Sequence, residues 1–170
     1  MAYPEILILR HLSRRPAHGY ELRKRIEETT GIVINNNSLY PALKRFVEAG
    51  AVEVTVEQYE SKPPRHVYTL TDVGRELLHD LLSELPAAQA GDDLEFLTRL
   101  GQFAFLDAAE RAAIIDVRSA ALEALRERLA ALEGRTSDEF WSSAVVAHLR
   151  EQIESELRWL NRLRAEVSRS

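Results

Sequence analysis

Residues 35–46 read NNNSLYPALKRF, and this stretch decides how the rest of the sequence is interpreted. Asparagine and serine side chains accept hydrogen bonds from the unpaired N–H groups at a helix start, and proline is tolerated in the first turn because its missing N–H has no partner there. The apolar residues that follow have the i, i+4, i+7, i+8 spacing of one buried stripe: Leu39, Leu43, Phe46 and Val47. The stretch therefore predicts an amphipathic helix over about residues 36–48, with Ser38, Tyr40, Lys44 and Arg45 facing elsewhere.

Two short helices are predicted before this one, and the hydrophobic pattern changes after it. Apolar residues at helical spacing occupy residues 6–12 and again 19–31, where the closing glycine is typical of a helix end. Valines alternate with polar residues over 52–56, and RHVYTL (65–70) alternates again, which predicts a two-stranded hairpin with a tip of about six residues. Thr71 and Asp72 then begin a fourth helix.

The second half of the chain predicts only helices. PAAQAG (86–91) has few bulky apolar residues and is interpreted as a linker between a domain of residues 1–85 and one of residues 92–170. Capping residues and heptad-like apolar spacing predict helices near 92–106, 108–133 and 137–167. A helix of about 30 residues is about 45 Å long, so the last one is expected to need a partner.

Composition bounds the class of protein. A chain of 170 residues that is 45% hydrophobic and 29% charged has the composition of a globular protein, with either one sizeable core or two small ones. The absence of cysteine excludes disulfides, thiolate metal sites and cysteine nucleophiles. No apolar run approaches the length needed to span a bilayer, so we expect a cytoplasmic protein without membrane contact.

The net charge of −5 hides an uneven distribution. Residues 10–45 carry eight basic and three acidic side chains, whereas residues 86–170 carry 11 basic and 15 acidic ones. The positive charge is therefore concentrated around the helix that opens with NNNSLY.

The order helix, helix, helix, hairpin, helix is that of a winged helix-turn-helix, in which the third helix enters the DNA major groove and the hairpin reaches the flanking backbone. A helix that starts with asparagine, serine and tyrosine places hydrogen-bonding groups and its positive dipole end where bases and phosphates lie. We therefore expect a mainly α fold: a winged helix-turn-helix of three helices, a two-stranded wing and a fourth helix, followed by an all-helical dimerisation domain.

The same residues resemble the PadR-like family of transcriptional regulators. ILRHLSRRPAHGYELRKRI is similar to the first two helices of the family, SLYPALKRFVEAGAVE to its recognition helix, and RHVYTLTDVGRELL to its second wing strand and following helix. ESELRWLNRL is similar to the last helix of the branch with a virulence-activator-like C-terminal domain. The run of Asn35 to Ser38 and the wing sequence SKPPRH (61–66) depart from the family pattern, so the resemblance does not transfer an operator sequence.

The pattern and the resemblance together assign a set of DNA-binding candidates on the recognition helix (about 36–48), the wing (about 58–66) and the helix before them. They are Tyr20, Lys24, Asn36, Asn37, Ser38, Tyr40, Lys44, Arg45, Lys62 and Arg65. Each has a simpler interpretation. The polar run at 35–38 caps the helix or contacts DNA, the tyrosines are partly buried or contact phosphates, and Lys44 is a solvated side chain or a phosphate contact.

No pattern of catalysis or metal binding accompanies these residues. The five histidines lack a ligand motif, and the chain has no Gly-rich phosphate loop or nucleophile elbow, so we expect no enzyme activity, no metal and no cofactor.

The predicted regulator is a homodimeric repressor that binds an inverted-repeat operator in double-stranded DNA. A two-fold seam is expected from a stripe that an isolated chain would leave exposed: Leu149, Ile153, Leu157 and Leu160. The resemblance implies control by an effector; a small aromatic or apolar molecule is expected, entering between the halves near Trp159, whose indole offers a stacking face. The alternative is a winged-helix protein-interaction module that does not bind DNA.

Overall fold

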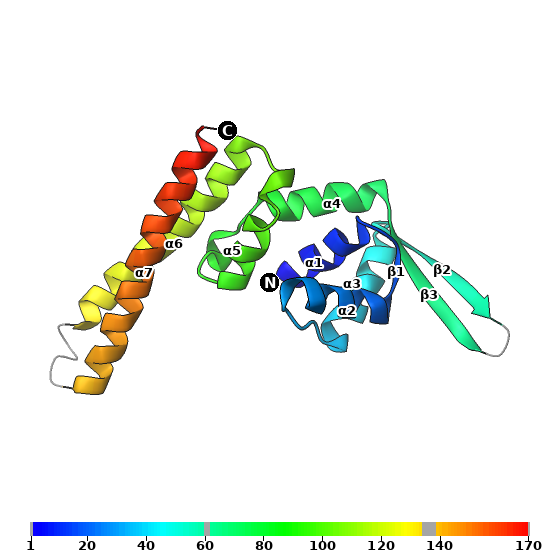
Figure 1. Cartoon of the computed structure of the whole chain (residues 1–170), viewed down its shortest axis with the longest axis horizontal. Coiled ribbons are helices and arrows are strands. Elements are labelled where there is room, and N and C mark those ends of the chain that lie inside the picture. Colours follow the sequence, from blue (N-terminus) through cyan, green and yellow to red (C-terminus); the bar gives the residue numbers. More distant parts are fainter. Residues whose placement is uncertain (1, 60–61, 134–138, 170) are drawn as a thin grey trace. The chain divides into compact units, whose positions relative to one another are not determined.

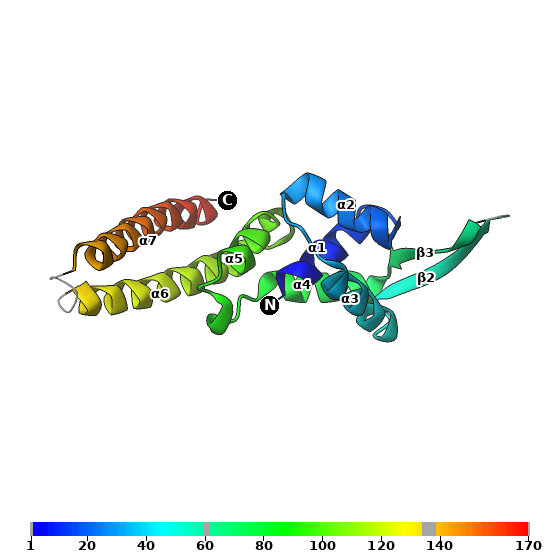
Figure 2. The ribbon, with the colours of Figure 1, turned by 90° about the horizontal axis from the view of Figure 1, so that it is seen from below.

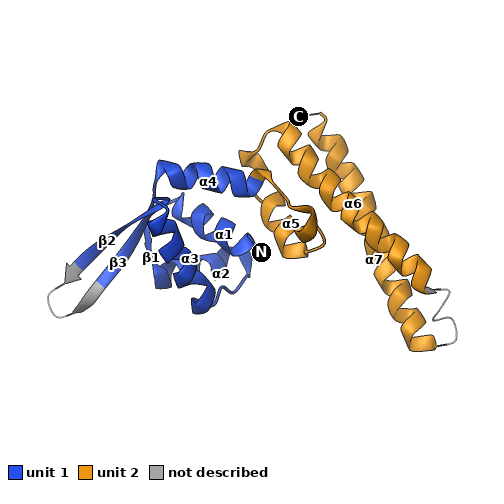
Figure 3. Cartoon of the chain, turned by 180° about the vertical axis from the view of Figure 1, so that it is seen from behind, with its two compact units in different colours: residues 1–82 blue, residues 83–170 orange. Residues whose placement is uncertain are grey.

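The computed structural model describes residues 2–59, 62–133 and 139–169, and the side chains of residues 58, 59, 62–64 and 133 lie outside this description. The chain divides into two compact units, residues 1–82 and 83–170 (Figure 3). The boundary predicted from the sequence, 85/86, lies three residues later.

Three helices form the body of the first unit: α1 (Tyr3–Leu12), α2 (Gly19–Thr30) and α3 (Asn36–Glu48) (Figure 1). Gly31 follows α2 with φ 71°, the left-handed conformation that lets the chain leave a helix. The three helices pack their apolar stripes together, and fully buried side chains come from each of them: Ile6, Ile8, Leu9, Leu22, Ile26 and Leu39. The predicted α3 bounds of 36–48 agree with the structure.

The wing is part of a sheet with three strands, whereas the sequence pattern predicts two. Strands β1 (Ala17–His18), β2 (Val52–Tyr59) and β3 (Lys62–Leu70) are antiparallel neighbours in the order β1-β3-β2. The expected six-residue hairpin tip is wrong, because β2 runs to Tyr59 and β3 starts at Lys62, with a register shift between Glu57 and Tyr59. Strand β1 is only two residues long, so it leaves no alternating pattern to recognise.

Helix α4 (Asp72–Ser83) begins as predicted. The hydroxyl of Thr71 accepts a hydrogen bond from the N–H of Gly74 at 3.1 Å and donates one to the carbonyl of Gly50 at 2.7 Å. A Cβ on Gly74 would overlap the carbonyl oxygen of Ala51. The glycine therefore allows α4 to start in contact with the backbone that enters the wing.

Helices α5 (Asp93–Leu100), α6 (Ala108–Glu133) and α7 (Phe140–Val167) build the second unit, with short 3₁₀ turns at Ala87–Gln89 and Phe103–Phe105. Helices α6 and α7 lie side by side and antiparallel (Figures 1 and 2). Two of the predicted caps are present. The Asp92 carboxylate accepts from the N–H groups of Leu94 and Glu95, and the N–H groups of Asp107 and Glu110 donate to each other's carboxylates at 2.8 Å.

Buried arginines hold the second unit together. Arg118 of α6, 2% exposed, donates to the Ala90 carbonyl at 2.8 Å, to Asp93 at 2.6 Å and to Glu156 of α7. In α5, Arg99 pairs with Glu95 at 2.7 Å, and both side chains are at most 1% exposed. Buried charges are tolerated only when they are paired and hydrogen-bonded, and both arginines meet that condition.

The expected dimer seam on α7 needs correction, because most of its residues are buried within the single chain. Ile153, Leu157 and Leu160 are 5%, 8% and 0% exposed in the single chain, so they belong to its own core. Leu149 alone is exposed, at 39%. The sequence shows that the stripe needs a covering partner, but it cannot show that this partner includes the chain's own α6 rather than a second copy.

Candidate nucleic-acid interface

The start of α3 carries exposed hydrogen-bonding groups. The Asn35 side chain caps the helix by accepting the N–H of Ser38 at 2.8 Å, so the capping interpretation holds for this residue. The side chains of Asn36, Asn37 and Ser38 are exposed in the first turn. Asn35 therefore caps the helix, whereas its neighbours Asn36, Asn37 and Ser38 expose their hydrogen-bonding groups.

Pro41 lies inside α3, and the expectation that it occupies the first turn is wrong. The helix begins five residues earlier, at Asn36, so the proline removes one N–H that would bond to the carbonyl of Asn37. Asn37 and Pro41 are both exposed positions.

Of the lysines and arginines predicted to contact DNA, Lys24, Lys44, Arg45 and Arg65 are exposed, and three of these four have acidic partners. Lys24 pairs with Glu28 at 3.6 Å and Lys44 with Glu48 at 3.8 Å, each one helical turn apart on the surface. Exposed ion pairs of this kind contribute less than about 1 kcal/mol to stability, so a DNA phosphate can replace the glutamate as the partner of either lysine.

Arg45 is engaged differently, because its guanidinium reaches Glu5 of α1 at 2.5 Å. The ion pair joins α3 to α1, which gives Arg45 a structural role beside the one expected from sequence.

Gly19 and Tyr40 pack directly together. A Cβ on Gly19 would lie 2.8 Å from Cε1 of Tyr40 and 3.1 Å from its hydroxyl oxygen, closer than atoms normally approach. The glycine of the HGY sequence therefore makes room for the ring of Tyr40, whose side chain is 45% exposed. Tyr20, the next residue, is 66% exposed, with the Arg23 guanidinium 5.8 Å from its ring centre.

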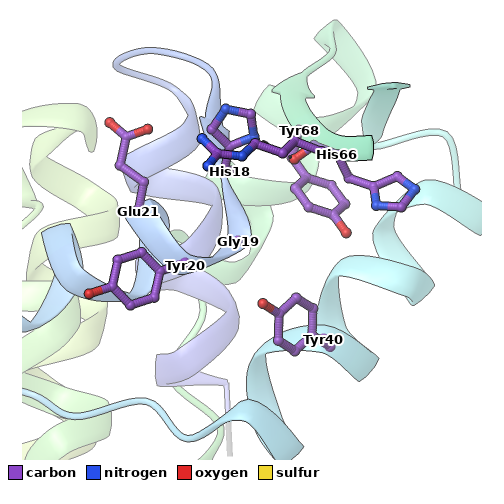
Figure 4. A pocket seen from close by; sticks show the side chains of 8 residues that line it. His18, Gly19, Tyr20, Glu21, Tyr40, His66 and Tyr68 are labelled. Carbon is purple, nitrogen blue, oxygen red and sulfur yellow. Dashed lines mark hydrogen bonds between the residues drawn. The ribbon is translucent and has the colours of Figure 1, made fainter. Parts of the chain in front are cut away.

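A hollow of about 500 Å³ lies where α2 begins, beside α3 and the wing, and we call it the wing hollow (Figure 4). It is lined by His18, Gly19, Tyr20, Glu21, Tyr40, Arg65, His66 and Tyr68. The hydroxyls of Tyr40 and Tyr68 point into the same open space in Figure 4. Burial of Tyr68, together with the nearby Tyr40, raises the pKa of the Tyr68 hydroxyl above its ordinary value, so it remains a hydrogen-bond donor at neutral pH.

His18 connects the start of α2 to the wing. Its Nδ1–H donates to the backbone carbonyl of His66 at 3.0 Å, and its Nε2 lies 3.7 Å from a carboxylate oxygen of Glu57 on β2. The wing is thereby tied to the helix that carries Tyr20. Arg65 is exposed at this end of β3, and the side chain of Lys62 lies outside the described residues.

His18, His66 and Tyr68 line the wing hollow but were not predicted from the sequence. His66 and Tyr68 are two apart on β3, so they share the face of the strand that borders α3. The alternating pattern of RHVYTL carries this signal, but the pattern does not show which face meets the recognition helix.

Trp159 lies in the second unit, half-buried, with its ring edge-on to Phe96 at a centroid distance of 6.2 Å. It borders a hollow of about 510 Å³ whose other residues are Asp93, Leu97, Arg118, Gln152, Ser155 and Glu156. A planar stacking face and several polar groups therefore meet at one place.

No cluster of three or more potential metal-ligating side chains occurs within the described residues. Among the same residues, no helix has both the length and the apolar character required to cross a membrane.

The sequence profile described as the transcriptional regulator PadR-like family matches residues 8–80, which include α2, α3 and the whole wing. A PadR family transcriptional regulator from Eggerthella lenta is 33% identical over 46% of this chain and 70% of that chain, with a TM-score of 0.41. The chain belongs to the PadR-like family. Family membership makes it a transcriptional regulator and not an enzyme, and the expected winged-helix fold is confirmed.

Other solved PadR structures extend over nearly the whole chain. Bacillus subtilis PadR in complex with operator DNA is 22% identical, with 96% of this chain and 98% of that chain covered and a TM-score of 0.46. The same protein in complex with p-coumaric acid is 20% identical, with 98% and 96% covered and a TM-score of 0.42. No curated protein sequence matches the chain.

Proposed function

We propose that this PadR-like regulator binds double-stranded DNA by placing α3 in the major groove and the wing on the flanking backbone. The observation that carries the proposal is the exposed polar side of α3. Asn36, Asn37 and Ser38 are exposed in its first turn, and Tyr40 and Lys44 line a common hollow against the wing. Asparagine is suited to read adenine in the major groove, whereas lysine and tyrosine bind phosphates and fix the register. We assign the remaining candidates to contacts with the DNA backbone: Tyr20, Lys24, Arg45, Arg65 and Lys62.

The test is the salt dependence of DNA binding by wild type and Lys44→Ala. Each phosphate contact contributes about 0.9 to the slope of log affinity against log salt, so the variant should bind all sequences more weakly and lose about that much slope. Arg128→Ala is the matched control, because Arg128 is an exposed cation on α6 of the second unit. Equal slopes for wild type and Lys44→Ala would remove Lys44 from the interface.

The same measurement separates the rival function, a winged-helix protein-interaction module. Binding through several cationic contacts weakens steeply as salt rises, whereas an apolar protein contact changes little. A chain with no measurable affinity for duplex DNA even at low salt would favour the module.

We further propose a cytoplasmic homodimer that acts as a repressor on an inverted-repeat operator. Half-site centres are expected about 10 bp apart or at a multiple of that, because the two recognition helices enter successive major grooves. With Ile153, Leu157 and Leu160 buried in the chain, the seam moves to the exposed side of α7. There Trp141, Val145 and Leu149 recur every four residues and are 77%, 58% and 39% exposed.

Sedimentation tests this seam. Val145→Glu places a carboxylate in the centre of the proposed contact without touching the chain's own core, so it should convert a dimer at micromolar concentration into a monomer. Dimerisation equal to that of wild type would place the seam elsewhere.

The effector is proposed to be a small planar aromatic or apolar molecule that stacks on Trp159 in the hollow beside Arg118 and Glu156. Such a molecule should quench tryptophan fluorescence. It should also weaken operator binding, and operator DNA should weaken the binding of the molecule by the same factor. A panel of planar aromatics titrated against wild type and Trp159→Phe tests this. The proposal fails if no compound changes both the fluorescence and the DNA affinity.

A further inference from the structure

The face of the wing that borders α3 carries a histidine. His66 and Tyr68 point to the same side of β3, and their partners on β2 are Val56 and Val54. A second hollow of about 410 Å³, between this face and α3, is lined by Tyr40, Lys44, Val47, Glu48, Val54, His66 and Tyr68. His66 and Tyr68 thus border both this hollow and the wing hollow, and so does Tyr40 of α3.

The two valines opposite these side chains are unusually exposed for a strand. Val54 is 37% and Val56 52% exposed, so the chain leaves this face of the wing uncovered next to the recognition helix. His66 is itself exposed. A DNA backbone that follows α3 would pass over this face, because Lys44 and Tyr40 line the same hollow.

Charged and titratable groups approach His66 from each neighbouring element. Helix α3 contributes Lys44, whose ammonium pairs with Glu48, and the hydroxyl of Tyr40. Strand β1 contributes His18, which donates to the backbone carbonyl of His66 and faces Glu57 of β2. The first turn of α2 contributes Glu21, which lines the wing hollow with His66 and pairs with Arg25 at 2.6 Å.

On β3 itself, Arg65 and Tyr68 flank His66 at one and two residues' distance. Glu21, Glu48 and Glu57 each have a cationic or imidazole partner, so the open side of the face presents mainly hydrogen-bond donors.

We propose that this face seats one DNA backbone phosphate against His66, so that DNA binding is coupled to the uptake of a proton by its imidazole. The inference rests on the proposed DNA-binding function and deepens it. The neutral ring carries one N–H, and a proton from solvent on its other nitrogen gives a cation with two N–H donors. The phosphate oxygen accepts from that cation, and the hydroxyls of Tyr40 and Tyr68 supply neutral donors beside it.

Histidine is the side chain whose charge ordinarily changes between pH 5 and 8, so the contact has a direct readout. Binding of a fluorescein-labelled random-sequence 40-bp duplex is followed by anisotropy at pH 6.0 and 7.5, at one ionic strength. A random duplex suffices because phosphate contacts are independent of sequence. Wild type should bind roughly fivefold more tightly at pH 6.0, the scale expected for one charge-assisted contact formed over this range.

Three variants test whether His66 couples proton uptake to DNA binding. His66→Gln should bind at both pH values with less than about twofold difference, since the amide cannot take up a proton. His66→Lys should bind at pH 7.5 at least as tightly as wild type and show no pH dependence, because lysine is charged throughout. His148→Gln is the control, since His148 is an exposed histidine on α7 of the second unit, and it should keep the wild-type dependence.

Wild-type pH dependence in His66→Gln, or none in wild type, would overturn the proton coupling while leaving DNA binding in place. Absence of duplex binding at any pH and low salt would overturn this inference and the proposed function together. Circular dichroism at both pH values confirms that each variant is folded where it is measured.

Discussion

Gly19→Ala is predicted to weaken DNA binding by displacing Tyr40. The new Cβ would lie 2.8 Å from Cε1 of Tyr40, and ordinary contact begins at 3.4 Å, so the ring must retreat by 0.6 Å. The obstacle is an exposed side chain and not backbone, so the ring can swing toward solvent without disturbing the core. Alanine is also the better residue in a helix, by about 0.5–1 kcal/mol.

The expected loss follows from one hydrogen bond. A hydroxyl that donates to a charged phosphate contributes about 1.5–3 kcal/mol, which corresponds to roughly ten- to 150-fold in affinity. Anisotropy titration of a duplex should therefore give about this loss for Gly19→Ala and also for Tyr40→Phe. Because both changes remove the same contact, the double variant should be no weaker than Tyr40→Phe alone.

Gly91→Ala is the matched control, since nothing lies within 4 Å of a Cβ at that glycine. The urea midpoint of Gly19→Ala should equal or exceed that of wild type. Wild-type affinity in Gly19→Ala, or losses that add in the double variant, would refute the placement of Tyr40 on DNA by this glycine.

Three further changes act on stability. Glu95→Ala leaves the buried Arg99 without its carboxylate, so urea unfolding should show a loss of about 3–5 kcal/mol, against less than about 1 kcal/mol for breaking an exposed pair. Gly74→Ala forces a methyl group against the Ala51 carbonyl and should cost about 1–3 kcal/mol, measured in the same way. Burial, reinforced by the neighbouring Arg14, lowers the pKa of His11 below 6.5. The unfolded chain therefore binds a proton on His11 more readily than the folded chain does. The contribution of His11 to folding stability is present above pH 6.5 and is lost as pH falls. Thermal melts of His11→Gln should not show this loss.

Local signals made most of the fold predictable. The start and end of α3 depend on Asn35 and on apolar spacing within the helix, and all of that information lies within a few turns. Tertiary partners are different, because the apolar stripe of α7 is the same whether another helix of the chain or another molecule covers it. Arg118 interrupts the apolar rhythm of α6 in sequence, but only the structure shows it bonded to Ala90, Asp93 and Glu156.

The candidate site was predictable in its charged and polar residues and less so in its geometry. Lys44 and Tyr40 follow from the pattern of α3. Whether Tyr68 and His66 belong to the site depends on which face of β3 meets α3. Whether His18 belongs to it depends on the two-residue strand β1, which pairs with β3 at a distant position in the sequence. Such pairing is set by three-dimensional packing and not by local propensity.

That short strand also sets an order of events in folding. Ala17 pairs with Tyr68, 51 positions later in the chain, so the contact requires closure of a long loop before it contributes any stability. Contacts between α1 and α2 span much shorter separations, such as the 18 residues between His11 and Thr29, and can form earlier. During synthesis, the link between the start of α2 and the wing can therefore form only after residue 68 has left the ribosome. Until then, the segment that presents Tyr20 lacks its attachment to β3, and a nascent chain that ends before the second wing strand would carry helices but no completed DNA-binding surface.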